Sequence, residues 1–376
     1  MASTYSIKDS LVTSPIREER NFFNIEPTLL ISLLLLCAVG LAVLYSATSG
    51  EMAAITRQSI RFALGYVALL VLAQIPPKDL ARWSPWLYLM SVALLFMVIA
   101  IGYSGKGAQR WIDLGIVRFQ PSELLKIFLP MMIAWYFSEK PIPPKILQIL
   151  IALMLIIIPA GLVLRQPDLG TALLISFGGI CVIFLAGITW RLLAVFGGIV
   201  LASMPVFWFY LHDYQRQRIL TMLNPESDPL GTGYHIIQSK IAIGSGGLYG
   251  KGWLNGTQSQ LDFIPERSTD FIFAVFSEEF GFFGVVLLLC VYGFIVMRGL
   301  AIAARAQDTY SRLLAGSLSL SFFAYFLVNI GMVSGVLPVV GVPLPLISYG
   351  GTSAVTILAA FGILMSIHSH RKFLSH

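Results

Sequence analysis

Charged residues are scarce in this sequence. They make up 12% of the 376 residues, about half of the roughly 25% that is typical of soluble domains. Hydrophobic residues make up 57%, and the mean hydropathy is +0.80. Such a chain cannot cover a folded surface with polar groups, which excludes an ordinary soluble globule, a disordered chain and a collagen-like chain. A polytopic membrane protein remains.

Several residue patterns that carry chemistry are also missing. The three cysteines, Cys37, Cys181 and Cys290, all lie inside apolar runs, which leaves no disulfide framework and no CxxC metal pair. The five histidines form no HExxH motif and no cluster at zinc spacing. No G-x-S-x-G elbow is present. Zinc and serine-hydrolase chemistry therefore have little support.

Apolar runs long enough, or nearly long enough, to cross a bilayer dominate the chain. A spanning helix needs about 20 mostly apolar residues. The runs lie at 28–47, 60–75, 84–103, 120–137, 146–163, 170–188, 191–211, 271–297, 312–334 and 350–368. We therefore expect an all-α polytopic membrane protein with about ten transmembrane helices, forming a single membrane domain over 28–370.

The distribution of basic residues predicts the orientation of these helices. With the N-terminus in the cytoplasm, the cytoplasmic segments hold 13 of the 25 Lys and Arg residues and 7 of the 19 Asp and Glu residues. The balance of +6 on that side equals the net charge of the whole chain. The positive-inside rule then places both terminal segments, 1–27 and 371–376, in the cytoplasm. The positive charge is a topology signal rather than a nucleic-acid footprint.

Residues 212–270 form a long polar loop between the seventh and eighth runs, which is extracytoplasmic in this topology. Loops of this length are usually functional or disordered, and the aromatic residues in this one indicate some folded substructure. Its glycine stretch, 244–252, fails the Walker pattern because Gly252 follows Lys251 where Ser or Thr is needed. A glycine-rich turn near Lys240 and Lys251 can still hold an anion through backbone N–H groups.

Ionisable residues in or near a membrane are costly, so each one is a candidate for function. Glu123 and Lys126 are spaced i, i+3 on the fourth run and can pair, either as a structural ion pair or as the lining of a polar cavity. Asp168 lies in a Pro-Asp-Leu-Gly turn, where a helix cap is as plausible as a direct role. Asp270 opens the eighth run at the boundary between water and lipid. A partly buried carboxylate there suits general-base work, although a simple cap is the alternative.

Several motifs, in one order along the chain, carry a family resemblance. They are Gly107–Gly115 (GAQRWIDLG), Gln120–Glu123 (QPSE) with Lys126, Gln166–Thr171 (QPDLGT), Ala242–Gly247 (AIGSGG) with Gly250–Gly252, Pro265–Arg267 with Thr269–Phe271, and Pro338–Gly351 (PVVGVPLPLISYGG). From the first run to Lys372 the chain resembles the SEDS family, named for shape, elongation, division and sporulation. The compact N-terminus and the 236–248 stretch favour the elongation branch over the division branch.

The resemblance implies a peptidoglycan glycosyltransferase of the bacterial cytoplasmic (inner) membrane, with ten spans and a large extracytoplasmic loop. The implied reaction polymerises lipid II, a disaccharide–pentapeptide on undecaprenyl pyrophosphate, during cell elongation. The implied partners are a class B penicillin-binding protein, which crosslinks the glycan, and other membrane proteins of the elongation complex. The family's essential acid falls on Asp270, and its cavity pair falls on Glu123 and Lys126.

The chemistry of this transfer sets what the site must contain. An α-linked donor that gives a β-1,4 link is inverted, so the reaction needs a base for the acceptor 4-hydroxyl and cations for the leaving pyrophosphate. Asp270 is the best base candidate. The candidate substrate-binding residues are Arg110, Trp111, Glu123, Lys126, Arg216, Arg218, Lys240 and Lys251. A divalent cation on Asp270 or Glu123 is also possible, but no ligand spacing decides this, and no cofactor is assigned.

Two other functions compete with the glycosyltransferase. A transporter that flips lipid II would favour inverted repeats and polar groups along the whole route. The sequence shows no clear repeat, and its unexplained charges cluster on one face. A non-catalytic scaffold for the crosslinking partner would explain the long loop but not the dense polar outer face.

Overall fold

The computed structural model describes residues 25–105, 108–113, 118–211, 213–228, 231–261, 263–264 and 266–370. The terminal segments that were expected in the cytoplasm lie outside these residues, apart from 25–27. Each of the ten predicted runs overlaps a helix of the structure. These helices are α1 (Pro27–Ala47), α2 (Met52–Gln74), α3 (Pro77–Ile101), α4 (Ser122–Ser138), α5 (Ile146–Arg165), α6 (Leu169–Leu185), α7 (Trp190–Tyr210), α11 (Ile272–Ala304), α12 (Thr309–Val333) and α13 (Thr352–Ser369).

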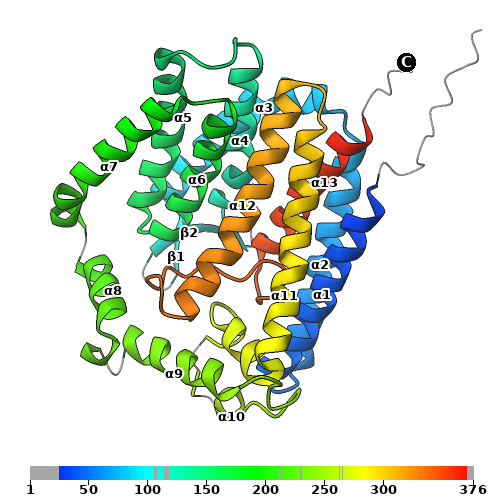
Figure 1. The fold of residues 1–376 in the computed structure, drawn as a ribbon, viewed down its shortest axis with the longest axis vertical. Coiled ribbons are helices and arrows are strands. Elements are labelled where there is room, and N and C mark those ends of the chain that lie inside the picture. Colours follow the sequence, from blue (N-terminus) through cyan, green and yellow to red (C-terminus); the bar gives the residue numbers. More distant parts are fainter. Residues whose placement is uncertain are drawn as a thin grey trace, which may run out of the picture.

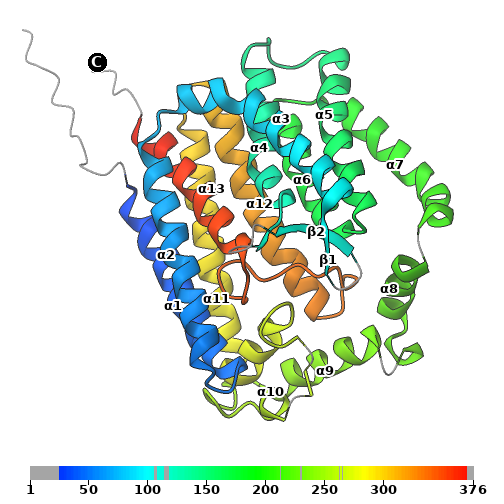
Figure 2. The same cartoon turned by 180° about the vertical axis from the view of Figure 1, so that it is seen from behind.

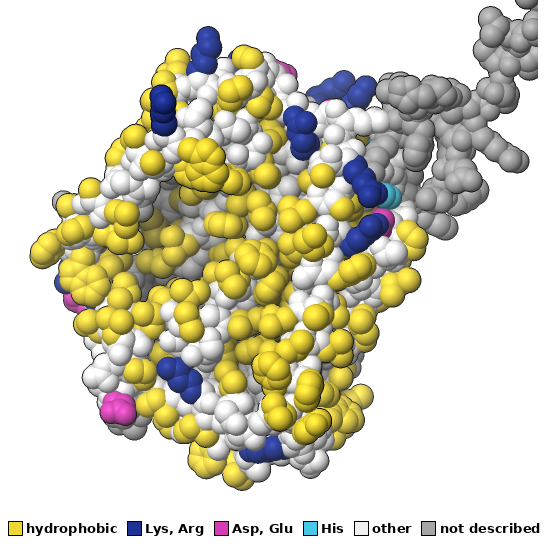
Figure 3. All heavy atoms as spheres, viewed as in Figure 1, with side chains coloured by type: hydrophobic (Ala, Val, Ile, Leu, Met, Phe, Trp, Pro, Cys, Tyr) yellow, Lys and Arg dark blue, Asp and Glu magenta, His cyan; other side chains and the backbone are white. Residues whose placement is uncertain are grey.

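The helices form the bundle of a multi-pass membrane protein, as the composition predicts. Within the described residues, seven helices are long and apolar enough to cross a membrane: α1, α2, α3, α5, α11, α12 and α13. Helix α6 and the first part of α7 are apolar but shorter. Figure 3 shows a broad hydrophobic band on one face of the molecule, with most Lys and Arg side chains above it and a few below. Lipid contact explains why so many large apolar side chains remain exposed.

The predicted polar loop is largely helical. It contains α8 (Asp213–Leu223), the short 3₁₀ helix η1 (Pro225–Ser227), α9 (Thr232–Ser245) and α10 (Thr257–Gln260). These helices lie together at one end of the bundle, which we call the loop face (Figure 1). Ser239 Oγ on α9 donates a hydrogen bond to the carbonyl of Val333 at 2.7 Å, which attaches the loop to the end of α12.

Two membrane helices begin earlier than the apolar runs predict. Helix α2 begins at Met52 rather than near residue 60, and α3 begins at Pro77 rather than near residue 84. Charged residues lie between the start of each helix and its apolar run, Arg57 in α2 and Lys78, Asp79 and Arg82 in α3, and an apolar-run criterion leaves them outside the helix. Proline has no backbone N–H. It is tolerated at Pro77 because an N–H group in the first turn of a helix has no intrahelical acceptor.

A small antiparallel sheet joins α3 to α4, where the sequence predicted an outer loop. Strands β1 (Tyr103–Gly105), β2 (Ala108–Asp113) and β3 (Arg118–Phe119) lie in the order β1-β2-β3. Trp111 on β2 pairs with Tyr103 on β1. The sheet holds β2, Ala108–Asp113, at the loop-face side of the bundle (Figure 2).

The connection between α12 and α13, residues 334–351, has no regular secondary structure but is inserted into the bundle. We call it the inserted loop. Leu344, Leu346 and Ile347 are 1–2% exposed. A Cβ on Gly40 of α1 would lie 2.9 Å from the Ile347 Cα, so glycine lets this loop approach α1 closely. Helix α13, which follows the inserted loop, packs tightly against α2. Gly65 of α2 lies against Leu358 of α13, and Gly362 of α13 lies against Leu69 of α2.

Helix α7 stands apart from the other membrane helices. Both ribbon views place it at the outer edge of the molecule, connected onward to α8 (Figures 1 and 2). Its large apolar side chains are exposed, among them Trp190 at 78% and Phe209 at 77%. The position of this helix therefore depends on lipid contact more than on contact with the bundle.

Helix α11 is broken near its start. Gly281 has φ 63° and ψ −165°, so two helices meet there at a kink. Residues 271–279 before the break are all buried. The eighth predicted run, 271–297, thus combines a short buried helix with a longer helix. The sequence did not predict this division.

The glycine loop, residues 246–252, supplies the hydrogen bonds that the break removes from α11. The N–H groups of Lys251 and Gly252 donate to the carbonyls of Glu278 and Glu279, both at 3.0 Å. In return, Phe282 N–H donates to the Gly247 carbonyl at 2.9 Å, and Phe283 N–H donates to the Leu248 carbonyl at 3.1 Å. Without these partners the backbone groups at the break would make no hydrogen bond within the helix, and in hydrocarbon each unmade bond costs several kcal/mol.

Candidate active site

Asp270 lies in the turn directly before α11 and is half-buried. It therefore opens the helix, as predicted, but it is not the cap residue, because that position belongs to Phe271. The inserted loop passes beside it: a Cβ on Gly341 would lie 3.6 Å from Asp270 Oδ2. Gly341 has φ +73°, a conformation that favours glycine. The Asp270 carboxyl group thus lies next to the backbone of Gly341, which has no side chain to cover it.

Helix α9 places His235 beside Phe271, the residue that follows Asp270. The His235 ring lies 5.5 Å from the Phe271 ring, centroid to centroid. Burial lowers the pKa of His235 below its usual value, although the negative charges of Glu266 and Asp228 oppose this shift. Burial therefore favours the neutral imidazole over the charged one beside the Asp270 turn, and a neutral ring has one hydrogen-bond donor and one acceptor. Sequence reasoning did not single out this residue.

Glu123 and Lys126 form the ion pair that their spacing predicts. Lys126 Nζ lies 2.6 Å from Glu123 Oε1, and the two side chains are only 12% and 7% exposed. Thr356 Oγ1 of α13 donates to Glu123 Oε2 at 3.1 Å. The ammonium also lies over the Tyr325 ring of α12, 4.8 Å from its centroid. The pair therefore joins α4, α12 and α13.

This ion pair borders a cavity of about 40 Å³ between α4, α12 and α13. Lys126, Ser321, Tyr325 and Thr356 line it together with apolar side chains. A space of this size holds one or two water molecules. The ion pair left open by the sequence is thus present, but only Lys126 of the two residues lines the cavity, and most of the other lining side chains are apolar. Sequence reasoning missed Tyr325 and Thr356, whose only signal is a polar group within an apolar helix.

Arg110 connects the small sheet to the turn between α5 and α6. Its guanidinium donates to the carbonyls of Gln166, at 3.2 Å, and of Pro167. It also pairs with Asp168, with 3.6 Å between Nη1 and Oδ2. Trp111, the next residue, is half-buried on β2. Arg110 is one-third exposed, so one part of its charge still faces outward.

Asp168 fulfils the cap role that the sequence allowed. Its Oδ1 accepts a hydrogen bond from Thr171 N–H at 3.1 Å, and the carboxyl group is 8% exposed. Gln120 also donates to its Oδ2 at 3.3 Å. The turn lies against the inserted loop, because a Cβ on Gly170 would lie 2.8 Å from the Val340 carbonyl. Asp168 and Asp270 therefore border the same loop.

The cations of the long loop have partners of different kinds. Arg216 on α8 donates to the carbonyls of Trp208 and Phe209, at 2.9 and 2.7 Å, and so completes the end of α7. Arg218 lies on the same helix and is half-buried. Lys240 on α9 is exposed and lies beside Gly335, at the end of α12, where the helix dipole favours a cation.

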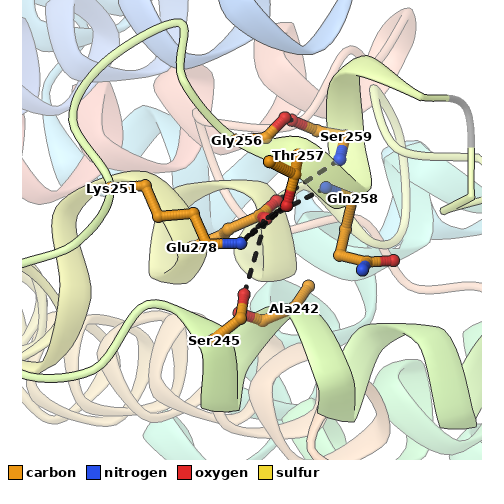
Figure 4. Close-up of polar contacts among 8 residues, drawn as sticks. All are labelled: Ala242, Ser245, Lys251, Gly256, Thr257, Gln258, Ser259 and Glu278. Carbon is orange, nitrogen blue, oxygen red and sulfur yellow. Dashed lines mark hydrogen bonds and ion pairs between the residues drawn. The ribbon is translucent and has the colours of Figure 1, made fainter.

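Lys251 is bound inside the protein by Glu278. Its Nζ lies 2.7 Å from Glu278 Oε1, and this carboxylate is completely buried. Oxygen and nitrogen donors of Ser245, Thr257, Gln258 and Ser259 also reach the Glu278 carboxylate, at 3.0 to 3.4 Å. Figure 4 shows these groups converging on one side chain. The polar groups of the glycine loop therefore bind α11 and the Glu278 carboxylate. These contacts give no support to the anion site that the sequence of the loop suggests.

A comparison with protein families assigns the chain. The model of the cell cycle protein family FtsW/RodA/SpoVE matches residues 26–373. The chain belongs to the FtsW/RodA/SpoVE family. This confirms the resemblance to the SEDS family that the motifs carry.

Members of the FtsW/RodA/SpoVE family align with nearly the whole chain. The peptidoglycan glycosyltransferase MrdB of Escherichia coli K12 is 55% identical over 353 residues, which cover 94% of this chain and 95% of the relative. The probable peptidoglycan glycosyltransferase FtsW of Trichlorobacter lovleyi is 38% identical over 358 residues, covering 92% and 93%.

Solved structures of similar proteins share the fold. One is a chain from a study of the structural coordination of polymerization and crosslinking by a peptidoglycan synthase complex. It is 35% identical with a TM-score of 0.81, covering 93% of this chain and 99% of that one. The rod shape determining protein RodA of Thermus thermophilus is 30% identical with a TM-score of 0.70, covering 92% and 98%.

Proposed function

We propose that the protein is a peptidoglycan glycosyltransferase that polymerises lipid II during cell elongation. One observation carries the proposal. Asp270 and the Arg110–Asp168 pair border the inserted loop, and the Glu123–Lys126 pair is bonded to the helix that follows it. Ionisable groups from distant parts of the chain thus gather around one segment of a membrane protein, where they are costly unless they serve a function. The relatives named as peptidoglycan glycosyltransferases support the same reaction.

In this mechanism Asp270 is the general base. Its carboxylate takes the proton of the acceptor 4-hydroxyl as that oxygen attacks the anomeric carbon of the donor, and the bond to pyrophosphate breaks on the opposite face. The transfer is therefore inverting and needs no covalent enzyme intermediate. A half-buried carboxylate suits this role because it remains reachable by a substrate while it is partly shielded from water.

The leaving pyrophosphate needs positive charge near it. We propose that Arg110, Lys126, Arg216, Arg218 and Lys240 provide it, with Trp111 and Glu123 shaping the same site. Lys251 stays a prediction as a substrate ligand, although its ammonium is bonded to Glu278. The apolar tail of the substrate would lie among the exposed apolar side chains of the membrane helices.

A divalent cation fits this site only in part. The described residues contain no group of three or more His, Cys, Asp or Glu side chains that could hold a metal ion. Asp270 and Glu123 are single carboxylates, and Glu123 is already bonded to Lys126 and Thr356. A Mg²⁺ ion held by one carboxylate together with substrate phosphates is a known arrangement. Such an ion would neutralise phosphate charge at Asp270, and the base step above does not depend on it.

We also propose the topology and partners. The protein lies in the bacterial cytoplasmic membrane with both termini in the cytoplasm, so the loop face is extracytoplasmic. A class B penicillin-binding protein and other membrane proteins of the elongation complex are the proposed partners. The support is the likeness to a chain of a peptidoglycan synthase complex in which polymerization and crosslinking are coordinated.

Polymerisation of lipid II by the purified protein with its transpeptidase partner tests the proposal. We expect glycan chains with the native protein and at least a 100-fold lower rate with Asp270→Asn, because the amide cannot accept the proton (general acid–base catalysis contributes about 10²–10⁴-fold). A folded Asp270→Asn variant that polymerises at the native rate would show that Asp270 is not the base. Movement of lipid II across vesicles without any glycan product would favour the transporter instead.

A further inference from the structure

Three successive carbonyl groups at Asp270 each accept a hydrogen bond from another part of the chain. The donors are Tyr349 N–H to the Ser268 carbonyl at 2.8 Å, Ser348 Oγ to the Thr269 carbonyl at 2.6 Å, and Asn329 Nδ2 to the Asp270 carbonyl at 2.9 Å. Residues 266–270 have no helix or strand geometry of their own. Apart from local turn bonds to the Glu266 carbonyl, their conformation is therefore set by these contacts rather than by a regular backbone ladder. We call the three bonds the clamp.

The two side chains of the clamp have little freedom to turn away. Asn329 is completely buried, and its amide nitrogen also donates to the Val342 carbonyl at 2.7 Å. Ser348 is 4% exposed, and its Oγ accepts the N–H of Leu344 at 2.8 Å. A hydroxyl has a single proton, which Ser348 donates to the Thr269 carbonyl while its oxygen accepts the Leu344 N–H, so the two bonds together fix the side chain.

The inserted loop, which carries Ser348 and Tyr349, is itself fixed to two membrane helices. Tyr292 Oη of α11 donates to the Pro345 carbonyl at 2.7 Å. Gln58 of α2 is 1% exposed and makes long hydrogen bonds, both at 3.4 Å, to the Ser348 carbonyl and from the Gly350 N–H. The clamp thus connects the Asp270 turn to rigid elements on several sides.

We propose that Asn329 and Ser348 are positioning residues that fix the location of the Asp270 carboxyl group. They act on the main chain of the turn, so neither needs to touch substrate. This inference rests on the proposed function, in which Asp270 must meet one hydroxyl group in one geometry. A displacement of about 1 Å in a reacting group can lower a rate by about 10²-fold, so two buried hydrogen bonds to the main chain of the turn can control turnover.

Kinetics of Asn329→Leu and Ser348→Ala test the proposal in the lipid II assay. Leucine keeps the branched side-chain skeleton of asparagine while removing both donated bonds. We expect kcat to fall at least 10-fold in each variant while KM stays within twofold. Ser317→Ala is the matched control, because Ser317 is also completely buried on α12 and donates to a carbonyl of another helix, Gly178, at 2.7 Å. Ser348→Thr retains the hydroxyl and should restore most of the turnover lost in Ser348→Ala.

Hydrogen exchange provides a readout that does not depend on activity. The Tyr349 amide should exchange at least 10-fold faster in Asn329→Leu and Ser348→Ala than in the native protein, and at the native rate in Ser317→Ala. If the native protein makes no glycan but the exchange changes as expected, the proposed function fails and the clamp stands. Native turnover in both variants, native exchange in both, or an equal loss of kcat in the Ser317→Ala control, overturns the positioning role.

Discussion

The backbones of Gly250 and Gly281 are in direct contact where α11 breaks. A Cβ on Gly250 would lie 2.7 Å from the Gly281 nitrogen, and a Cβ on Gly281 would lie 2.7 Å from the Tyr249 carbonyl carbon. Both glycines also have positive φ, +79° and +63°. Each position therefore requires glycine for two separate reasons, the space and the backbone conformation.

Alanine at Gly281 should destabilise the protein by at least about 2 kcal/mol, from the left-handed conformation and the backbone overlap together. The thermal midpoint in one detergent measures this. Gly293→Ala is the control, since that glycine lies on the same helix with no atom within 4 Å of its would-be Cβ. It should be neutral, or stabilising by up to about 1 kcal/mol. Equal effects at the two positions would show that the contact does not matter.

Removing one partner of the Glu278–Lys251 pair should cost roughly 3 kcal/mol, because a buried charge is left without its counter-charge. Lys251→Met is the informative change, since it leaves the completely buried Glu278 carboxylate charged. The double variant with Glu278→Gln should lose less stability than the sum of the two single variants. Protease cleavage within 245–259 should be faster in both single variants. Additive losses would indicate that the two groups are independent.

Exchanging the charges of Glu123 and Lys126 separates their two roles. The single change Lys126→Glu places two acids in a nearly dry site and should prevent stable folding. Adding Glu123→Lys restores the attraction, so the thermal midpoint should recover. Turnover should stay at least 10-fold below the native value, because the cation leaves the Tyr325 ring and the carboxylate leaves Thr356. A native rate of lipid II polymerisation in the double variant would assign the pair a structural role alone.

Acid should weaken the attachment of Glu26 to Arg298 at the end of α1. Burial alone would raise the pKa of the Glu26 carboxyl, but hydrogen bonds from Thr28, Arg298 and the Leu29 N–H outweigh it and lower the pKa below 4.5. The stabilisation is therefore present above pH 4.5 and is lost as pH falls through the folded-state value.

The thermal midpoints of the native protein and Glu26→Gln at pH 7 and pH 4 measure this contribution. Glutamine has no proton to gain, so the native advantage over Glu26→Gln should be largest at pH 7 and smaller at pH 4. An advantage that is the same at both pH values would show that the carboxylate charge does not contribute.

The membrane helices could be predicted from the sequence because the bilayer imposes length and apolarity on each one separately. The i, i+3 pairing of Glu123 with Lys126 was predictable for a similar reason, since it depends on one helix only. The cap at Asp168 is equally local.

Features that join distant segments could not be read from the sequence. The apolar run continues through Phe280, Gly281 and Phe282, and the groups that compensate the break come from the glycine loop some thirty residues earlier. The partners of Glu123 on α13 and of Asp270 on α12 are single polar residues in apolar helices. The sheet at 103–119 is formed by segments too short and too polar to give a periodic signal. In each case only the tertiary arrangement identifies the partner.

The order in which the segments of the broken helix are synthesised has a consequence for membrane insertion. Residues 246–252 leave the ribosome before Gly281, so the backbone groups that complete α11 already exist when its two parts emerge. Once residue 304 has left the ribosome, the emerged chain holds every group that closes the break, whereas a chain that begins at residue 256 would lack the groups that close it. The biogenesis of α11 therefore depends on the loop that precedes it.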